Sequence, residues 1–182
     1  MHAPETGGLA RPAAAPVRDF DGAALRRALG HFTTGVTVVT AARAGAAPIG
    51  ITVNSFNAVS LEPPLVLFSV ARHCHSLPAL RQAPAYAINV LRDDQRELSQ
   101  HFAGAQGAKW TDVHWQAGVT ASPLLDAVLA TFECEPFARH DGGDHEIFVG
   151  RVVALTHDEC AQPLVFFRGD YGTVVAPACA GS

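Results

Sequence analysis

The segment GDHEIFVG, residues 143–150, places His145 between two carboxylates, Asp144 and Glu146, at the start of an apolar run. An imidazole titrates near neutral pH, so a histidine in such a place can move a proton or orient a bound molecule. The preceding Gly142-Gly143 pair is typical of a hairpin turn, because glycine accepts a positive φ. These residues alone favour His145 as a hydrogen-bonded turn residue, with a functional role as the alternative.

The run His73-Cys74-His75 contains residue types that bind metal ions. Neighbouring side chains of an extended segment point to opposite faces, so only His73 and His75 can share one. Because a third and fourth ligand at suitable spacing is missing, we expect no metal site and favour a surface or phosphate-facing loop. The sequence also lacks Gly-x-Gly, a P-loop, G-x-S-x-G and H-E-x-x-H, so the common nucleotide and hydrolase motifs give no guidance.

Length and composition predict one domain. The chain has 182 residues, 48% of them hydrophobic, and a net charge of −4 without a basic run, which argues against nucleic acid or an anionic membrane as a partner. The longest apolar stretch, residues 64–71, is too short to span a bilayer. Four scattered cysteines without C-x-x-C suit reduced thiols in the cytoplasm. We expect a flexible leader at 1–18, a domain at 19–176 and a disordered tail at 177–182.

Hydrophobic patterning predicts more strand than helix. One amphipathic helix is expected at 22–33, capped by Asp21, with Leu25, Leu29 and Phe32 on its apolar face. A short helix is expected from Ser76, as its cap, to Gln82, and another from Asp93-Asp94 to near Phe102. Strands are expected at 36–41, 48–56, 63–71, 85–91, 125–139, 145–157 and 163–175. Short turns between them favour an antiparallel β-barrel with peripheral helices.

Six blocks of the chain occur in the order HFTTGVTVVTA, GITVNSFNAVSLEPPLVLFSVAR, YAINVL, LSQHFAG, GDHEIFVGRV and PLVFFRGDYG. Together they resemble the flavin reductase-like family, the short-chain NAD(P)H:flavin oxidoreductases that supply two-component monooxygenases. The resemblance extends from about Phe20 to Tyr171. It implies a mainly β FMN-binding split barrel of Greek-key type, and a homodimer with the flavin near the dimer interface.

The resemblance also implies a flavin site. The isoalloxazine and ribityl chain would lie along the polar strand end of residues 52–55, which without the other blocks is an ordinary Asx or Ser turn. The loop 72–76 would hold the phosphate, although relatives often carry lysine or serine where this chain has His73 and His75. Phe102, a core residue by periodicity, would lie near the flavin. The implied flavin-binding residues are Thr52, Val53, Asn54, Ser55, Ser60, Ser69, Arg72, His75, Ser76 and Phe102.

On the nicotinamide side, the resemblance implies His145, Arg168 and Tyr171, with His145 as the catalytic residue and Asp144 holding its tautomer. Donors fixed near the reduced flavin would lower the barrier to hydride transfer. NADH is expected over NADPH, because no basic cluster beyond Arg72 and Arg168 is available for the extra phosphate.

The expected function is therefore NAD(P)H-dependent reduction of FAD or FMN, with reduced flavin released to a separate monooxygenase. The alternatives are an electron carrier that holds FMN on the same barrel, an oxidase resembling the pyridoxamine phosphate oxidases, and a structural module without a cofactor. The GDH and RGDY blocks argue against the oxidase.

Overall fold

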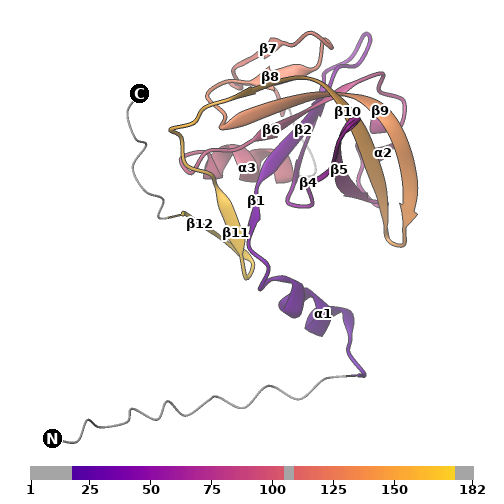
Figure 1. Ribbon diagram of the computed structural model, residues 1–182, viewed down its shortest axis with the longest axis vertical. Helices are drawn as coiled ribbons and strands as arrows, with labels where there is room; N and C mark the ends of the chain where they lie inside the picture. The colour runs from indigo at the N-terminus through magenta and orange to yellow at the C-terminus, as the bar shows by residue number, and fades with distance from the viewer. Residues whose placement is uncertain (1–17, 105–108, 175–182) are drawn as a thin grey trace, which may run out of the picture.

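The computed structural model describes residues 18–104 and 109–174, and its main element is a seven-stranded antiparallel sheet (Figure 1). The strand order is β3-β2-β6-β9-β10-β5-β4. The expected leader and tail lie outside the described residues, except for Arg18. The strands of this sheet are β2 (Thr37–Ala41), β3 (Ile49–Val53), β4 (Asn57–Leu61), β5 (Pro64–Ala71), β6 (Tyr86–Val90), β9 (Ala130–Gly142) and β10 (His145–His157).

Two small antiparallel sheets and three helices surround this sheet. None of these helices is long and apolar enough to cross a membrane. The predicted mainly β architecture with peripheral helices is confirmed. The small sheets consist of β1 (Thr34–Gly35), β11 (Val165–Phe167) and β12 (Asp170–Gly172), and of β7 (Trp115–Ala117) and β8 (Pro123–Leu125); the helices are α1 (Gly22–Leu29), α2 (Leu77–Leu80) and α3 (Arg96–Ala103).

The long hairpin β9–β10 forms the middle of the sheet and bends across the core. Its ladder shifts register between Val149 and Gly150 and again between Val152 and Ala154, as β-bulges do where strands bend. At the first shift the ring of Tyr86 packs directly over Gly150. Phe68 of β5 stacks on Phe148 of β10, with ring centroids 5.1 Å apart. The bend therefore wraps the sheet around an aromatic core.

The sheet curls far enough for the chain after β3 to meet β5, and a single side chain joins them. The Ser55 hydroxyl accepts a hydrogen bond from the Ser69 amide at 2.9 Å and donates one to the Ser69 carbonyl at 3.1 Å. No ladder pairs β3 with β5 in the described part of the chain. No ladder of the described residues thus closes the sheet at this point, and the Ser55 hydroxyl bridges the opening.

Helix α1 is shorter and less buried than predicted. Asp21 does cap it, accepting a hydrogen bond from the Ala24 amide at 2.7 Å, but the helix ends at Leu29 and not at residue 33. It lies apart from the main sheet, near β11 and β12 (Figure 1), and buries no residue. The apolar side chains of Leu25, Leu29 and Phe32 are exposed, so this face packs against no other part of the chain that the structure describes.

Several predicted boundaries were wrong. Ser76 precedes α2 without a side-chain capping bond, and α3 begins at Arg96 after Gln95, not at Asp93-Asp94. The expected strand at 125–139 is divided between β8 and β9, and 163–175 forms a hairpin whose turn carries a positive φ at Arg168 and Gly169. Strand β4 was missed because its residues resemble a turn before Pro63-Pro64. The hairpin β9–β10 was predicted correctly, with Gly143 at a φ of +73°.

We predict that Gly150→Ala destabilises the protein by about 1–3 kcal/mol, the usual cost of overpacking a filled core. A Cβ at this position would lie 2.5 Å from the Tyr86 hydroxyl and 2.9 Å from Cys134 Cβ. Gly35→Ala is the matched control, because a Cβ there meets nothing within 4 Å. Urea unfolding followed by circular dichroism should show the loss for Gly150→Ala only. Equal midpoints for the two variants would contradict the packing argument.

Candidate functional site

A cavity of about 430 Å³ opens where the ends of β3 and β5 meet the C-terminal end of α3. It lies next to the Ser55–Ser69 bridge that closes the split sheet. Nine of the residues predicted for the site line it: Thr52, Val53, Asn54, Ser55, Ser69, His75, Ser76, Phe102 and His145. The lining also includes Ile51, Val70, Ala71, His73, Cys74, Ala103, Gly104 and Lys109, none of which was predicted as a site residue.

The polar wall of the cavity is held by hydrogen bonds to backbone. The Thr52 hydroxyl donates to the Ser99 carbonyl of α3 at 2.6 Å, which joins the strand end to the helix. Phe102, only 1% exposed, contributes to both the core and the cavity wall, and its ring lies against Gly50. Phe102 is therefore a core residue, as its periodicity predicts, and it also lines the cavity. Strand and helix give the cavity a rigid floor.

His145 begins β10 at the rim of the cavity, paired with Gly142 across the hairpin and with Ala71 of β5. Its Nδ1 lies 2.7 Å from the Asp144 carboxylate. The hydrogen bond from His145 lowers the pKa of Asp144, so this carboxylate is ionised near neutral pH and accepts the Nδ1–H. Nδ1 is therefore occupied, and Nε2 is the nitrogen left for a bound molecule.

Lys109 is a charged residue of the cavity lining that sequence reasoning missed. Its ammonium group donates to the carbonyls of Phe102 at 3.0 Å and Gly50 at 3.4 Å, and partial burial lowers its pKa. Nothing in the spacing around Lys109 marked it, because its place at the cavity depends on backbone carbonyls distant in the sequence, such as that of Gly50. With His75 and Ser76, it also lines a neighbouring cavity of about 800 Å³, walled by Pro48, Pro78 and Trp110.

The charge of the cavity differs from that of the chain. Its described lining holds Lys109 and three histidines, His73, His75 and His145, and no carboxylate, although the net charge of the chain is −4. The neighbouring cavity of about 800 Å³, which we call the outer cavity, is also lined by Arg43, and its described lining likewise holds no carboxylate. Both spaces therefore suit an anionic molecule. Among the described residues, no three His, Cys, Asp or Glu side chains gather where they could hold a metal ion.

Four predicted site residues do not line the cavity. Ser60 lies on β4, and its hydroxyl accepts a hydrogen bond from the amide of Glu62, the residue after the strand. Arg168 lies in the β11–β12 turn beside α1. The Arg72 guanidinium is held on the β9–β10 hairpin and faces a different hollow. Tyr171 is linked to the site indirectly: its hydroxyl lies 2.9 Å from that of Ser99, the residue whose carbonyl binds Thr52.

Comparison with known proteins agrees with this architecture. The model of the flavin reductase like domain matches residues 29–174. The chain is 47% identical to FMN reductase (NADH) SmoA of Agrobacterium fabrum over 147 residues, which cover 81% of this chain and 83% of the relative. It is 38% identical to HsaB of Rhodococcus jostii, the reductase subunit of a flavin-dependent monooxygenase, over 80% of this chain and 74% of that protein.

A solved structure with the same fold is the NADH:FAD oxidoreductase SgcE6 of Streptomyces globisporus C-1027, in complex with NAD and FAD fragments. It superposes with a TM-score of 0.83 at 36% identity and covers 91% of this chain and 99% of that one. The described fold, the extent of the sequence match and this superposition lead to one assignment. The chain belongs to the flavin reductase-like family.

Proposed function

We propose that this protein is an NADH-dependent flavin reductase, which reduces FAD or FMN and releases the reduced flavin to a separate monooxygenase. The observation that carries the proposal is the cavity lined by His145, whose described lining holds Lys109, three histidines and small polar groups but no carboxylate. A flavin phosphate and a newly reduced, anionic isoalloxazine both need such surroundings. Of the similar proteins named above, one is an FMN reductase (NADH), one is the reductase subunit of a flavin-dependent monooxygenase, and one is an NADH:FAD oxidoreductase.

The strand end of residues 52–55 would hold the isoalloxazine and ribityl chain, with Ser69 and Phe102 as further wall. For the phosphate, we propose Lys109 together with His75 and Ser76, since these three residues line both cavities. The ammonium group of Lys109 uses two of its three donors on carbonyl groups, which leaves one for an anion. The outer cavity gives room for the adenylate half of FAD, and FMN would leave it open.

Bound flavin supplies the hydride-accepting chemistry, so the task of this chain is to bind, orient and stabilise. We propose that His145 acts through Nε2, either orienting the nicotinamide carboxamide or handling a proton at the ring. Asp144 fixes the tautomer by accepting the Nδ1–H. Tyr171 would hold Thr52 in place indirectly, because the Tyr171 hydroxyl bonds to that of Ser99 and the Ser99 carbonyl accepts the hydrogen bond of Thr52.

We further propose a homodimer in the cytoplasm. Against residues 18–104 and 109–174, helix α1 buries no residue, while Leu29 is 63% and Phe32, just after the helix, 72% exposed. A second copy of the chain that packed against α1 would bury these exposed apolar side chains and stabilise both copies. The cytoplasmic location rests on the scattered cysteines, which suit a reducing compartment.

The function predicts NADH oxidation that requires added FAD or FMN and that survives chelation of metal ions. Anaerobic assays should give one reduced flavin for each NADH, and the reduced flavin should pass through a filter that retains the protein. An electron carrier would keep its flavin on the protein side of the filter. A structural module would leave NADH untouched with every flavin, and either result would contradict the proposal.

For His145→Ala we expect an intact fold and unchanged flavin affinity, because the ring is at the rim of the cavity and fills no core position. The rate of flavin reduction should fall, or the KM for NADH should rise, by about ten- to a thousandfold, the range for one positioning or proton-handling group. Stopped-flow reduction by NADH measures both. Identical rates for variant and wild type at every NADH concentration would return His145 to a hydrogen-bonded turn residue.

The dimer can be tested on α1. Light scattering of the full chain should give twice the mass of one chain, and Leu29→Ser/Phe32→Ser should shift it toward the mass of a single chain. Val119→Ser is the control, because Val119 is 81% exposed in the turn between β7 and β8. A wild-type protein that is monomeric at micromolar concentration would rule out the proposed role of α1.

A further inference from the structure

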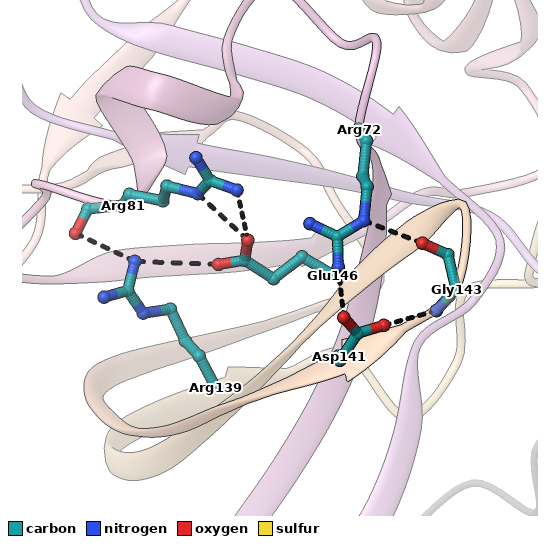
Figure 2. Close-up of polar contacts among 6 residues, drawn as sticks. All are labelled: Arg72, Arg81, Arg139, Asp141, Gly143 and Glu146. Atoms are coloured by element: carbon teal, nitrogen blue, oxygen red, sulfur yellow. Dashed lines mark hydrogen bonds and ion pairs between the residues drawn. The ribbon is translucent and has the colours of Figure 1, made fainter.

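Arg72 binds the turn of the β9–β10 hairpin (Figure 2). His145 is the first residue of β10 after this turn. The Arg72 Nε donates to the Gly143 carbonyl at 2.7 Å, and the Arg72 Nη2 lies 2.9 Å from the Asp141 carboxylate. Asp141 in turn accepts a hydrogen bond from the Gly143 amide at 2.8 Å. Arg72 and Asp141 thus hold both polar groups of the Gly143 peptide backbone, and Gly143 is the residue with the positive φ. We call this set, Arg72, Asp141 and Gly143, the turn clamp.

The turn clamp is continuous with the backbone of His145. The Arg72 amide donates to the Asp144 carbonyl at 2.9 Å, one residue before the ladder in which Ala71 pairs with His145. A shift of the turn would therefore move Asp144 and His145 together. The clamp is partly exposed, with 40% of the Arg72 side chain and 80% of the Asp141 side chain accessible, so its effect is on the geometry of the turn more than on overall stability.

A second ion-pair group holds the same hairpin one residue further along. Glu146, whose side chain is 11% exposed, binds Arg81 at 2.6 Å and Arg139 at 3.6 Å (Figure 2). Because successive side chains of β10 alternate between faces, Glu146 lies on the face opposite His145. The contacts of Glu146 therefore fix the start of β10, and Arg72 positions the turn at Gly143 and Asp144 that precedes it.

From these contacts we infer that Arg72 is a positioning residue for His145 and not a flavin phosphate ligand. Its guanidinium is shared between a carboxylate and a carbonyl on the hairpin, and it lines the hollow formed with Arg81, Arg139 and Glu146, not the flavin cavity. Arg72 thus contributes to hydride transfer by holding the turn that presents Nε2 of His145. The inference rests on the proposed role of His145 in the flavin reductase reaction.

The test compares flavin affinity with flavin reduction. Arg72→Ala should slow reduction by NADH, or raise the KM for NADH, by about tenfold, less than the roughly hundredfold that a 1 Å displacement of a reacting group can cost. Its affinity for FMN relative to riboflavin should stay at the wild-type ratio, because riboflavin lacks the phosphate. Lys109→Ala is the contrasting variant: it should weaken FMN while leaving riboflavin binding close to wild type. An FMN-selective loss in Arg72→Ala would overturn the inference.

A double-mutant cycle with His145→Ala identifies the route of the effect. If Arg72 acts through His145, Arg72→Ala should cost nothing further once the imidazole is gone. Additive losses, or an Arg72→Ala enzyme with wild-type reduction kinetics, would overturn the inference. Failure of the proposed function is distinct, since the wild-type protein would then oxidise no NADH with any flavin.

Two further variants keep the test valid if Arg72→Ala folds poorly. Arg72→Lys keeps the charge opposite Asp141 but cannot serve both acceptors in the same fork, so it should give an intermediate rate. Asp141→Asn should resemble Arg72→Ala. Arg151→Ala is the matched control, because Arg151 pairs with Glu135 at 2.8 Å on the same hairpin, far from His145 in the ladder. Equal losses of the reduction rate in Arg151→Ala and Arg72→Ala would mean that the turn clamp only supports the sheet, and would overturn the inference.

Discussion

The bend of the β9–β10 hairpin at Gly150 is the constraint on which the other features depend. Two 13-residue strands cannot stay flat and also enclose a core, so the ladder shifts register where Tyr86 occupies the space of a Cβ. The same bend brings β5 round toward the end of β3, where one serine hydroxyl completes the contact. The cavity exists because a ladder does not close this opening. Core packing and site geometry therefore share one cause.

The hairpin also explains how the sheet places His145 at the rim of the cavity. One end of β10 is locked to β5 over seven consecutive register pairs, from His145 to Arg151. Beyond the first pair there is only a tight turn, which would be free to move without the contacts of Arg72 and Asp141. The ladder with β5 thus holds β10, and the contacts of Arg72 and Asp141 hold the turn before it. Sites held in this way can keep a near-attack geometry without a covering lid.

Short-range patterns in the sequence predicted the strands and the hairpin turn well, because alternation and paired glycines act locally. They failed where the deciding contact is distant in the chain. The periodicity of α1 did predict a helix, but its apolar face has no partner in the described part of the chain. Arg72 was placed by its position in a loop, whereas its guanidinium follows Asp141 across the hairpin. Lys109 carried no motif, because its place is set by carbonyls of Gly50 and Phe102.

The alternation of β10 accounts for a histidine between two carboxylates. Side chains of successive residues face opposite sides of a strand, so His145 lines the cavity between β3, β5 and α3 while Glu146 faces Arg81 on the other side. Asp144, in the turn, reaches Nδ1 and keeps its own charge outside the cavity, with its side chain 92% exposed. Each carboxylate is thereby engaged without entering the site. A carboxylate-free cavity in an acidic chain follows from strand geometry, and it leaves Nε2 of His145 facing an environment suited to anions.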